Sequence, residues 1–70
     1  MKVVVNGEAQ EVPDGATVSA LLKLRKVKMP DMVSVELNGG ILDRGAFDST
    51  ALKESDAVEL LYFMGGGRAA

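Results

Sequence analysis

The sequence contains no cysteine and no histidine among its 70 residues. Without cysteine, neither a disulfide framework nor a thiolate zinc site can stabilise the fold. Without histidine, the chain lacks the commonest general base and the commonest metal ligand. A chain of this length forms at most one domain, whose stability must come from ordinary apolar packing. Valine, leucine, isoleucine, methionine and phenylalanine recur along almost the whole sequence, so the supply of apolar side chains is adequate.

Clustered positive charge and long apolar runs are also absent, and each absence excludes a class of partner. The formal net charge is −2, with acidic and basic residues interspersed, whereas binding a phosphate backbone needs clustered lysine and arginine. No stretch approaches the roughly 18 apolar residues of a membrane-spanning helix. The run Met1–Val5 reaches Asn6-Gly7 too early for a signal peptide. We therefore expect a soluble cytoplasmic protein that binds neither nucleic acid nor membrane.

The first residues predict a β-hairpin, with strands at Lys2–Val5 and Glu8–Val12. Asn6-Gly7 lies between them, and an Asn-Gly pair between apolar runs is a strong hairpin signal because both residues tolerate the positive φ of a type I′ turn. Pro13-Asp14-Gly15 ends the second strand, since proline removes a ladder donor and glycine turns the chain.

A single main helix is predicted from Val18 to about Lys26. Thr17 is a suitable N-cap, because its hydroxyl can accept a hydrogen bond from one of the first free amides. Val18, Leu21 and Leu22 have the i, i+3, i+4 spacing of one apolar helix face. The pattern therefore predicts an amphipathic helix that packs its apolar face on a sheet.

Three further strands are predicted in the second half of the chain, at Met32–Leu37, Ile41-Leu42 and Ala57–Phe63, and Asn38-Gly39-Gly40 is predicted as the turn between the first two. The last of them is rich in apolar residues and should therefore be central in the sheet. Between the last two strands the pattern is irregular, with Phe47 and Leu52 as the expected anchors into the core.

The order of these elements constrains the topology. An N-terminal hairpin, a helix that crosses the sheet and a later strand beside the first give a mixed sheet, with the right-handed crossover that such connections nearly always have. We predict an α+β fold, the ubiquitin-like β-grasp, with a mixed sheet of four to five strands and one main helix packed across it. Residues 1–64 would form this domain and residues 65–70 a C-terminal tail.

The most specific chemical signal is the glycine run Gly65-Gly66-Gly67, which follows the last predicted strand. Glycine is costly to order and packs nothing, so such a run predicts a mobile tail. A frayed terminus without a function is one interpretation. We favour a functional tail, because the glycines are contiguous and leave the final strand of a β-grasp pattern.

Six short segments, in this order and spacing, give the sequence its resemblance to a known family. They are Val5-Asn6-Gly7-Glu8, Val12-Pro13-Asp14-Gly15, Thr17-Val18 with Leu21-Leu22, Val35-Glu36-Leu37-Asn38-Gly39, Asp56-Ala57-Val58-Glu59 and Phe63-Met64-Gly65-Gly66-Gly67. Over residues 1–67 the chain resembles the ThiS family of ubiquitin-like sulfur carriers of thiamine biosynthesis. The related molybdopterin carriers usually have prolines shortly before their glycine pair, and this sequence has none there.

The resemblance implies a protein that is not an enzyme and has no catalytic residue, metal site or bound cofactor of its own. An E1-like adenylating enzyme, using ATP and Mg, would activate the terminal glycine, and a persulfide donor would convert it to a thiocarboxylate. Thiazole synthase would then accept the sulfur. Gly67 would carry the adenylate and the sulfur, and Gly65 and Gly66 would thread the partner's active site. Phe63 and Met64 would dock on the adenylating enzyme, although Phe63 suits the core equally well.

Arg68-Ala69-Ala70 depart from the family pattern, because members typically end at the glycines. An internal Gly67 has no free carboxylate to adenylate. We therefore expect a processing peptidase to remove Arg68–Ala70, with exposure of Gly66 as a less favoured variant. An artificial or degenerate tail is the alternative interpretation.

Three other functions remain open at the level of sequence. The first is a processed carrier of the same chemistry that serves cysteine, methionine or another sulfur metabolite. The second is a non-catalytic ubiquitin-like binding module, in which the tail does nothing. The third, ranked lower, is a modifier conjugated to lysines of other proteins.

Processing of the tail predicts a defined mass in the native cell. Protein isolated from that cell should have the intact mass of a chain that ends at Gly67. A fraction should be heavier by the difference between one sulfur and one oxygen atom, because a thiocarboxylate replaces the carboxylate. A full-length species that persists without any thiocarboxylate form would contradict this prediction.

Overall fold

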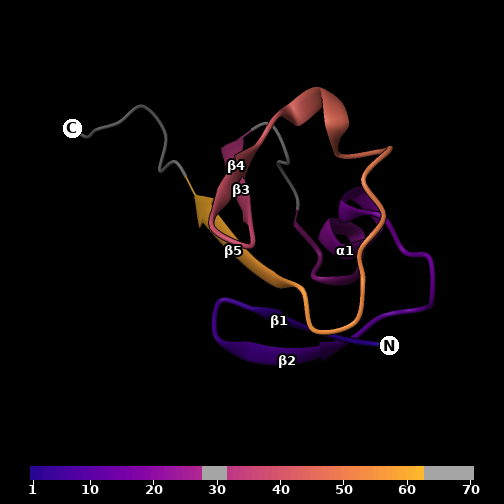
Figure 1. Ribbon diagram of the computed structural model, residues 1–70. Coiled ribbons are helices and arrows are strands. Elements are labelled where there is room, and N and C mark those ends of the chain that lie inside the picture. Colours follow the sequence, from indigo (N-terminus) through magenta and orange to yellow (C-terminus); the bar gives the residue numbers. More distant parts are fainter. Residues whose placement is uncertain (28–31, 63–70) are drawn as a thin grey trace.

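The computed structural model describes residues 1–27 and 32–62 and shows five strands, one α-helix and a short 3₁₀ helix in those ranges (Figure 1). The elements are β1 (Lys2–Val5), β2 (Glu8–Glu11), α1 (Val18–Leu24), β3 (Val33–Leu37), β4 (Gly40–Leu42), η2 (Arg44–Ala46) and β5 (Ala57–Tyr62). The strands form one sheet in the order β2-β1-β5-β3-β4. Among the strands in the described ranges, β1 and β5 pair in parallel, and the other three pairs are antiparallel. The predicted α+β, β-grasp arrangement with a mixed sheet is confirmed.

The two Asn-Gly turns have the geometry that their sequences indicate. Asn6 and Gly7 have φ values of 50° and 84°, and Asn38 and Gly39 have 51° and 87°. Positive φ at both central residues is the type I′ requirement, and asparagine and glycine tolerate it best. Each turn therefore sets the register of its hairpin, β1–β2 in the first case and β3–β4 in the second.

The helix begins where it was predicted and ends earlier. The Thr17 hydroxyl accepts a hydrogen bond from the backbone N of Ala20 at 3.2 Å, which confirms the N-cap. The helix ends at Leu24, not near Lys26, because Lys26 has a left-handed φ of 58°. Backbone hydrogen bonds from Lys26 to Lys23 and from Val27 to Leu22 close the end. This is the Schellman pattern, which usually has glycine at the left-handed position.

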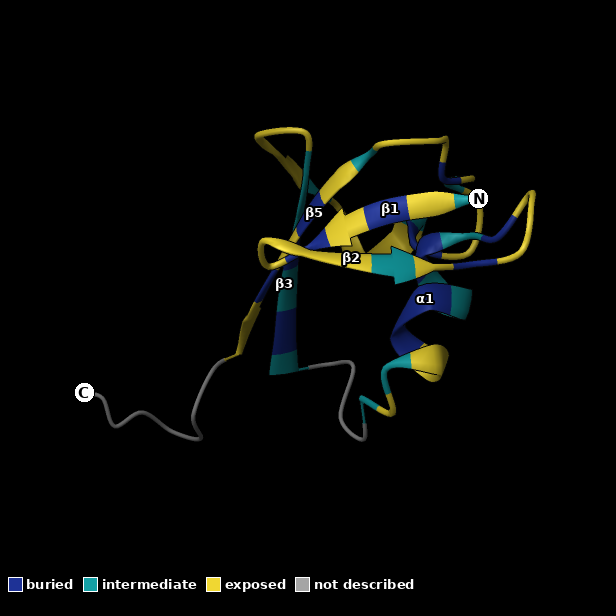
Figure 2. Cartoon of the chain, turned by 90° about the horizontal axis from the view of Figure 1, so that it is seen from below, coloured by how far each residue is buried: buried dark blue, intermediate teal, exposed yellow. Residues whose placement is uncertain are grey.

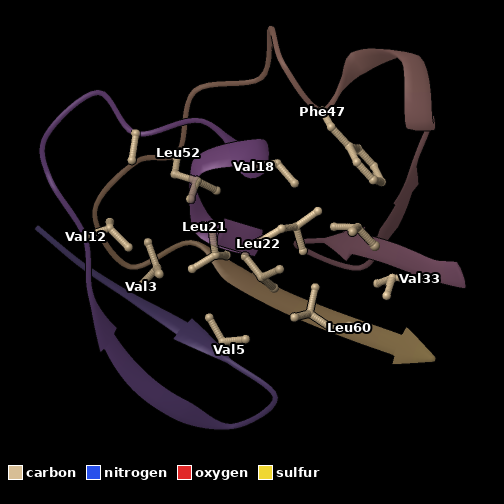
Figure 3. Packing of buried hydrophobic residues seen from close by; sticks show 13 residues of the cluster. Val3, Val5, Val12, Val18, Leu21, Leu22, Val33, Phe47, Leu52 and Leu60 are labelled. Carbon is tan, nitrogen blue, oxygen red and sulfur yellow. The ribbon is translucent and has the colours of Figure 1, made fainter. Parts of the chain in front are cut away.

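One hydrophobic core lies between α1 and the sheet (Figure 3). The predicted helix face Val18, Leu21 and Leu22 is buried in it. The sheet contributes the buried side chains Val3, Val5, Val33, Val35, Val58 and Leu60. Phe47 and Leu52 are also buried and anchor the segment between β4 and β5, as predicted. That segment runs along the start of α1, where the backbone N of Val18 donates to the oxygen of Thr50 at 3.0 Å.

The sheet is buried on one face only. Along β1, exposed and buried residues alternate (Figure 2). The strand β5 is central, as predicted, yet its apolar content does not mean burial on both faces: Val58 and Leu60 are buried, whereas Leu61 is 45% exposed. Its apolar residues therefore lie on both faces of the sheet, buried on one face and exposed on the other.

The left-handed lysine at the end of α1 predicts a stabilising substitution. Lys26→Gly should raise the free energy of unfolding by about 0.5–1 kcal/mol, because glycine removes the Cβ strain of positive φ while giving back part of the gain as unfolded-state entropy. Urea denaturation measures the change. Lys26→Ala is the matched control, since it removes the charge but keeps the Cβ. An equal gain in both variants would mean that charge, not backbone strain, limits stability there.

Candidate functional site

The candidate site is the C-terminal end of β5, from which the glycine-containing tail continues. The predicted site residues Phe63, Met64, Gly65, Gly66 and Gly67 lie outside the described residues. The structure places the residue before them: Tyr62 ends β5 and lies opposite Val33 of β3. The structure therefore shows how Tyr62, the root of the tail, is held in the sheet.

The side chain of Asn6 extends the sheet where β1 ends. The parallel pairing of β1 with β5 stops at Val5, which lies opposite Val58. The side-chain Oδ1 of Asn6 then accepts a hydrogen bond from the backbone N of Leu60 at 2.8 Å, and its backbone N donates to the oxygen of Val58 at 2.9 Å. The side chain thus replaces a strand residue and holds β5 two residues beyond the ladder.

The side chain of Asn38 does the same at the start of β5. Its Oδ1 accepts from the backbone N of Ala57 at 2.9 Å, and its backbone N donates to the oxygen of Ala57 at 2.7 Å. Its Nδ2 donates to Oδ1 of Asp56 at 3.0 Å. Both Asn-Gly pairs were predicted as structural turns; their side-chain bonds to the last strand were not predicted. No local pattern signals them, because the partners are 18 or more residues away.

The side chain of Arg44 holds β3 at this same end of the sheet. The strand β4 ends at Leu42, and beyond it the Arg44 guanidinium donates from Nη2 to the backbone oxygen of Val33 at 3.0 Å. A cavity of about 210 Å³ adjoins this point; its lining residues are Val33, Ser34, Ile41, Leu42, Asp43, Arg44 and Phe47. Val33, the residue opposite Tyr62, is therefore held both by β5 and by the segment that follows β4.

The described side chains offer little chemistry of their own. Within residues 1–27 and 32–62, His, Cys, Asp and Glu form no group of three or more that could hold a metal ion. The helix of this same part of the chain is too short to cross a membrane. What the arrangement can do is present the chain that follows Tyr62 from a firmly held central strand.

Comparison with known proteins gives a consistent result. The model of the ThiS family matches residues 3–67. A crystal structure of the thiamine biosynthesis protein ThiS from Geobacter metallireducens is 49% identical, with a TM-score of 0.82, over 96% of this chain and 100% of that one. A solution structure of a thiamine biosynthesis protein from the same organism is 47% identical, with a TM-score of 0.78, over 100% of this chain and 92% of that one.

Two curated relatives are longer proteins named thiazole synthase. The protein from Magnetococcus marinus is 35% identical over 68 residues, which are 97% of this chain and 21% of that protein. The protein from Paramagnetospirillum magneticum is 36% identical over 67 residues, which are 96% of this chain and 20% of that protein. The chain therefore spans about a fifth of the length of these relatives.

The Asn6 bond to β5 predicts an ordered set of stabilities. Asn6→Asp keeps an acceptor for the Leu60 amide and should change stability least. Asn6→Gly loses the bond but accepts positive φ, so it should cost about 1 kcal/mol. Asn6→Ala loses the bond and adds left-handed strain, so it should cost about 2 kcal/mol.

Urea denaturation gives these free energies, and amide hydrogen exchange localises the effect. In Asn6→Gly the Leu60 amide should gain exchange rate beyond the global change in stability. Uniform acceleration across β5 would show that Asn6 acts only on global stability and does not hold this amide.

Proposed function

The chain belongs to the ThiS family, and from this membership we propose that it is a sulfur carrier of thiamine biosynthesis whose C-terminal glycine bears the sulfur as a thiocarboxylate. The observation that most directly supports Gly67 as the sulfur-bearing residue is the extent of the family match, which begins at Val3 and ends at Gly67. The matched region thus ends at the last glycine of the run. The crystal structure of ThiS from Geobacter metallireducens supports the same fold around it.

The proposed chemistry begins with activation, because a carboxylate is a poor electrophile. The Gly67 carboxylate attacks the α-phosphorus of ATP in an E1-like adenylating enzyme that uses Mg, pyrophosphate leaves, and an acyl adenylate forms. The terminal sulfur of a persulfide donor then attacks the acyl carbon and AMP leaves. A thiol cleaves the resulting acyl disulfide, which leaves the thiocarboxylate on Gly67 and a disulfide on the donor side.

The carrier itself contributes shape and presentation, not acid–base or metal chemistry, and it is not an enzyme in this proposal. Residues without a Cβ can pass through a narrow channel, so Gly65 and Gly66 would lie in the partner's active site. Phe63 and Met64 would contact the partner outside that channel, since aromatic residues and methionine are enriched at interfaces. The strand β5, held by Asn6 and by β3, supplies the fixed base.

A thiazole synthase is the proposed sulfur acceptor. Support comes from the two longer relatives named thiazole synthase, in which the segment similar to this chain is about a fifth of the protein. Removal of Arg68–Ala70 by a peptidase would precede the whole sequence of reactions, because only then does Gly67 have a free carboxylate. The need for ATP agrees with a cytoplasmic location.

The proposal is tested by the position of the chain end. A chain that ends at Gly67 should support ATP–pyrophosphate exchange by the adenylating enzyme of the same organism. A chain that ends at Gly66 should be at least about 100-fold less active, because its carboxylate is displaced from the reacting position. The 70-residue chain should be inactive until the last three residues are removed.

Unfolding midpoints measured on the same three chains serve as the control for folding. Equal exchange activity in all three would refute activation at Gly67, as would an active chain that lacks both Gly66 and Gly67. Mass spectrometry of the product, with a persulfide donor present, should then detect the thiocarboxylate on Gly67.

A further inference from the structure

Half of the basic residues lie together where α1 ends. Four of the eight lysines and arginines fall between positions 23 and 28, and no acidic residue interrupts them; they are Lys23, Arg25, Lys26 and Lys28. Along the rest of the chain acidic and basic residues are interspersed. Residues 23–26, here called the basic end of α1, belong to the described part of the chain, whereas Lys28 lies outside it.

The cations of the basic end have no acidic partner among the described residues. The ion pairs found in residues 1–27 and 32–62 lie elsewhere, at the N-terminus and at Lys2. The Arg25 guanidinium donates from Nη1 to Oε1 of Gln10 at 3.1 Å, so a neutral amide holds it against β2. Lys23 and Lys26 are exposed. The basic end therefore presents positive charge that no ion pair in these ranges neutralises.

Lys26 occupies its position at a cost in stability. Its φ of 58° is left-handed, at a point of the Schellman pattern that glycine usually takes. A lysine there bears the Cβ strain of positive φ. A cation near the last carbonyls of a helix gains about 0.3–1 kcal/mol from the helix dipole, but Lys23 in the last turn already has that position. The stability of the fold therefore does not explain a lysine at position 26.

The basic end of α1 lies at the same end of the molecule as the root of the tail. Val27 packs against the core, and Val33, six positions later, pairs with Tyr62. An extended chain spans at most about 3.3–3.6 Å per residue, so Val27 and Val33 are at most roughly 20–22 Å apart. In Figure 2 the end of α1, the start of β3 and the end of β5 all lie toward the lower side of the view. An enzyme that holds Gly67, five positions after Tyr62, therefore comes within reach of the basic end.

We propose that the basic end of α1 docks on an acidic surface of thiazole synthase beside the active site that receives the tail. The inference rests on the proposed function, which supplies this partner. Lys23 and Lys26 meet carboxylates of the enzyme, and Leu24, which is 48% exposed, packs against an apolar side chain between them. Complementary charges of this kind speed the encounter and fix the orientation of the two proteins.

Two other occupants suit the basic end less well. The adenylating enzyme holds the polyphosphate of ATP next to Gly67, and the cations that it needs there would repel a basic surface. A nucleic acid requires more cations than this end supplies, because proteins that bind a phosphate backbone commonly make about 6–10 phosphate contacts.

Charge reversal at Lys23 tests the docking. In the chain that ends at Gly67, Lys23→Glu should raise the Kd for thiazole synthase of the same organism about tenfold at low ionic strength, because a carboxylate then meets carboxylates. The effect should shrink to less than about threefold near 0.5 M salt, which screens exposed charges. Lys53→Glu is the matched control: it makes the same charge change at an exposed residue shortly before β5, and should alter the Kd less than about twofold. Titration calorimetry measures all three values.

Lys26→Gly separates docking from stability. It should raise the free energy of unfolding, because the left-handed strain is relieved, and yet raise the Kd about two- to fivefold, because one contact charge is lost. Damage to the fold cannot produce a variant that folds better and binds worse. Lys53→Gly, which removes one charge elsewhere, should leave the Kd unchanged.

The outcomes separate the inference from the proposed function. If Lys23→Glu and Lys53→Glu raise the Kd equally, if neither raises it, or if Lys26→Gly leaves it unchanged, docking through the basic end is refuted while activation at Gly67 stands. If Lys23→Glu raises only the KM for the carrier in ATP–pyrophosphate exchange, the surface belongs to the adenylating enzyme and the inference is wrong. Binding of a single-stranded oligonucleotide that Lys23→Glu abolishes would overturn it as well. If the unaltered chain that ends at Gly67 supports no exchange, the proposed function fails and the inference fails with it.

Discussion

The parallel pairing of β1 with β5 is the contact on which the rest of the structure depends. It joins the first strand to the last described strand and so connects the two hairpins: β2 lies beside β1, and β3, which pairs with β4, lies beside β5. Only Val4 and Val5 take part directly, opposite Ala57 and Val58. The two strands are far apart in the sequence, so bringing them together costs loop-closure entropy before their contacts can stabilise the fold. The pairing therefore needs support from packing and from additional hydrogen bonds. The buried valines of both strands and the Asn6 side chain supply that support.

Asparagine at the two hairpin turns links local geometry to this central contact. A type I′ turn accepts several residue types, but glycine at the first central position would carry no side chain to donate or accept. Asn6 and Asn38 satisfy positive φ and also bond to β5 near its C-terminal and N-terminal ends. The strand from which the tail continues is consequently held by two side chains in addition to its neighbours. In the proposed function the chemistry lies at the chain end, and a firmly held last strand would give that end a fixed base.

The two faces of the sheet differ in burial and in residue type. The face toward α1 carries the valines and leucines that pack on the helix and stabilise a chain without disulfides. The opposite face leaves Ile41 and Leu61 exposed, and Glu36 and Glu59 lie there directly opposite each other on β3 and β5.

Sequence patterns alone determined the elements and the core, because the responsible interactions are local. Periodicity identified Val18, Leu21 and Leu22, the Asn-Gly pairs identified both hairpins, and Thr17 identified the start of the helix. The position of the helix end was missed, because Lys26 occupies a left-handed position that usually carries glycine.

The glycine run, likewise, is visible in the sequence, since the chemistry proposed for it depends on residue type and on its place after the last strand. Only the tertiary structure decided what β5 touches. Glu36 faces Glu59, and Asn6 reaches Leu60, across intervals of 23 and 54 residues that no local pattern encodes. Register between distant strands is set by the packing of the whole core, and that packing brings the acidic pair and the root of the tail onto the same strand pair.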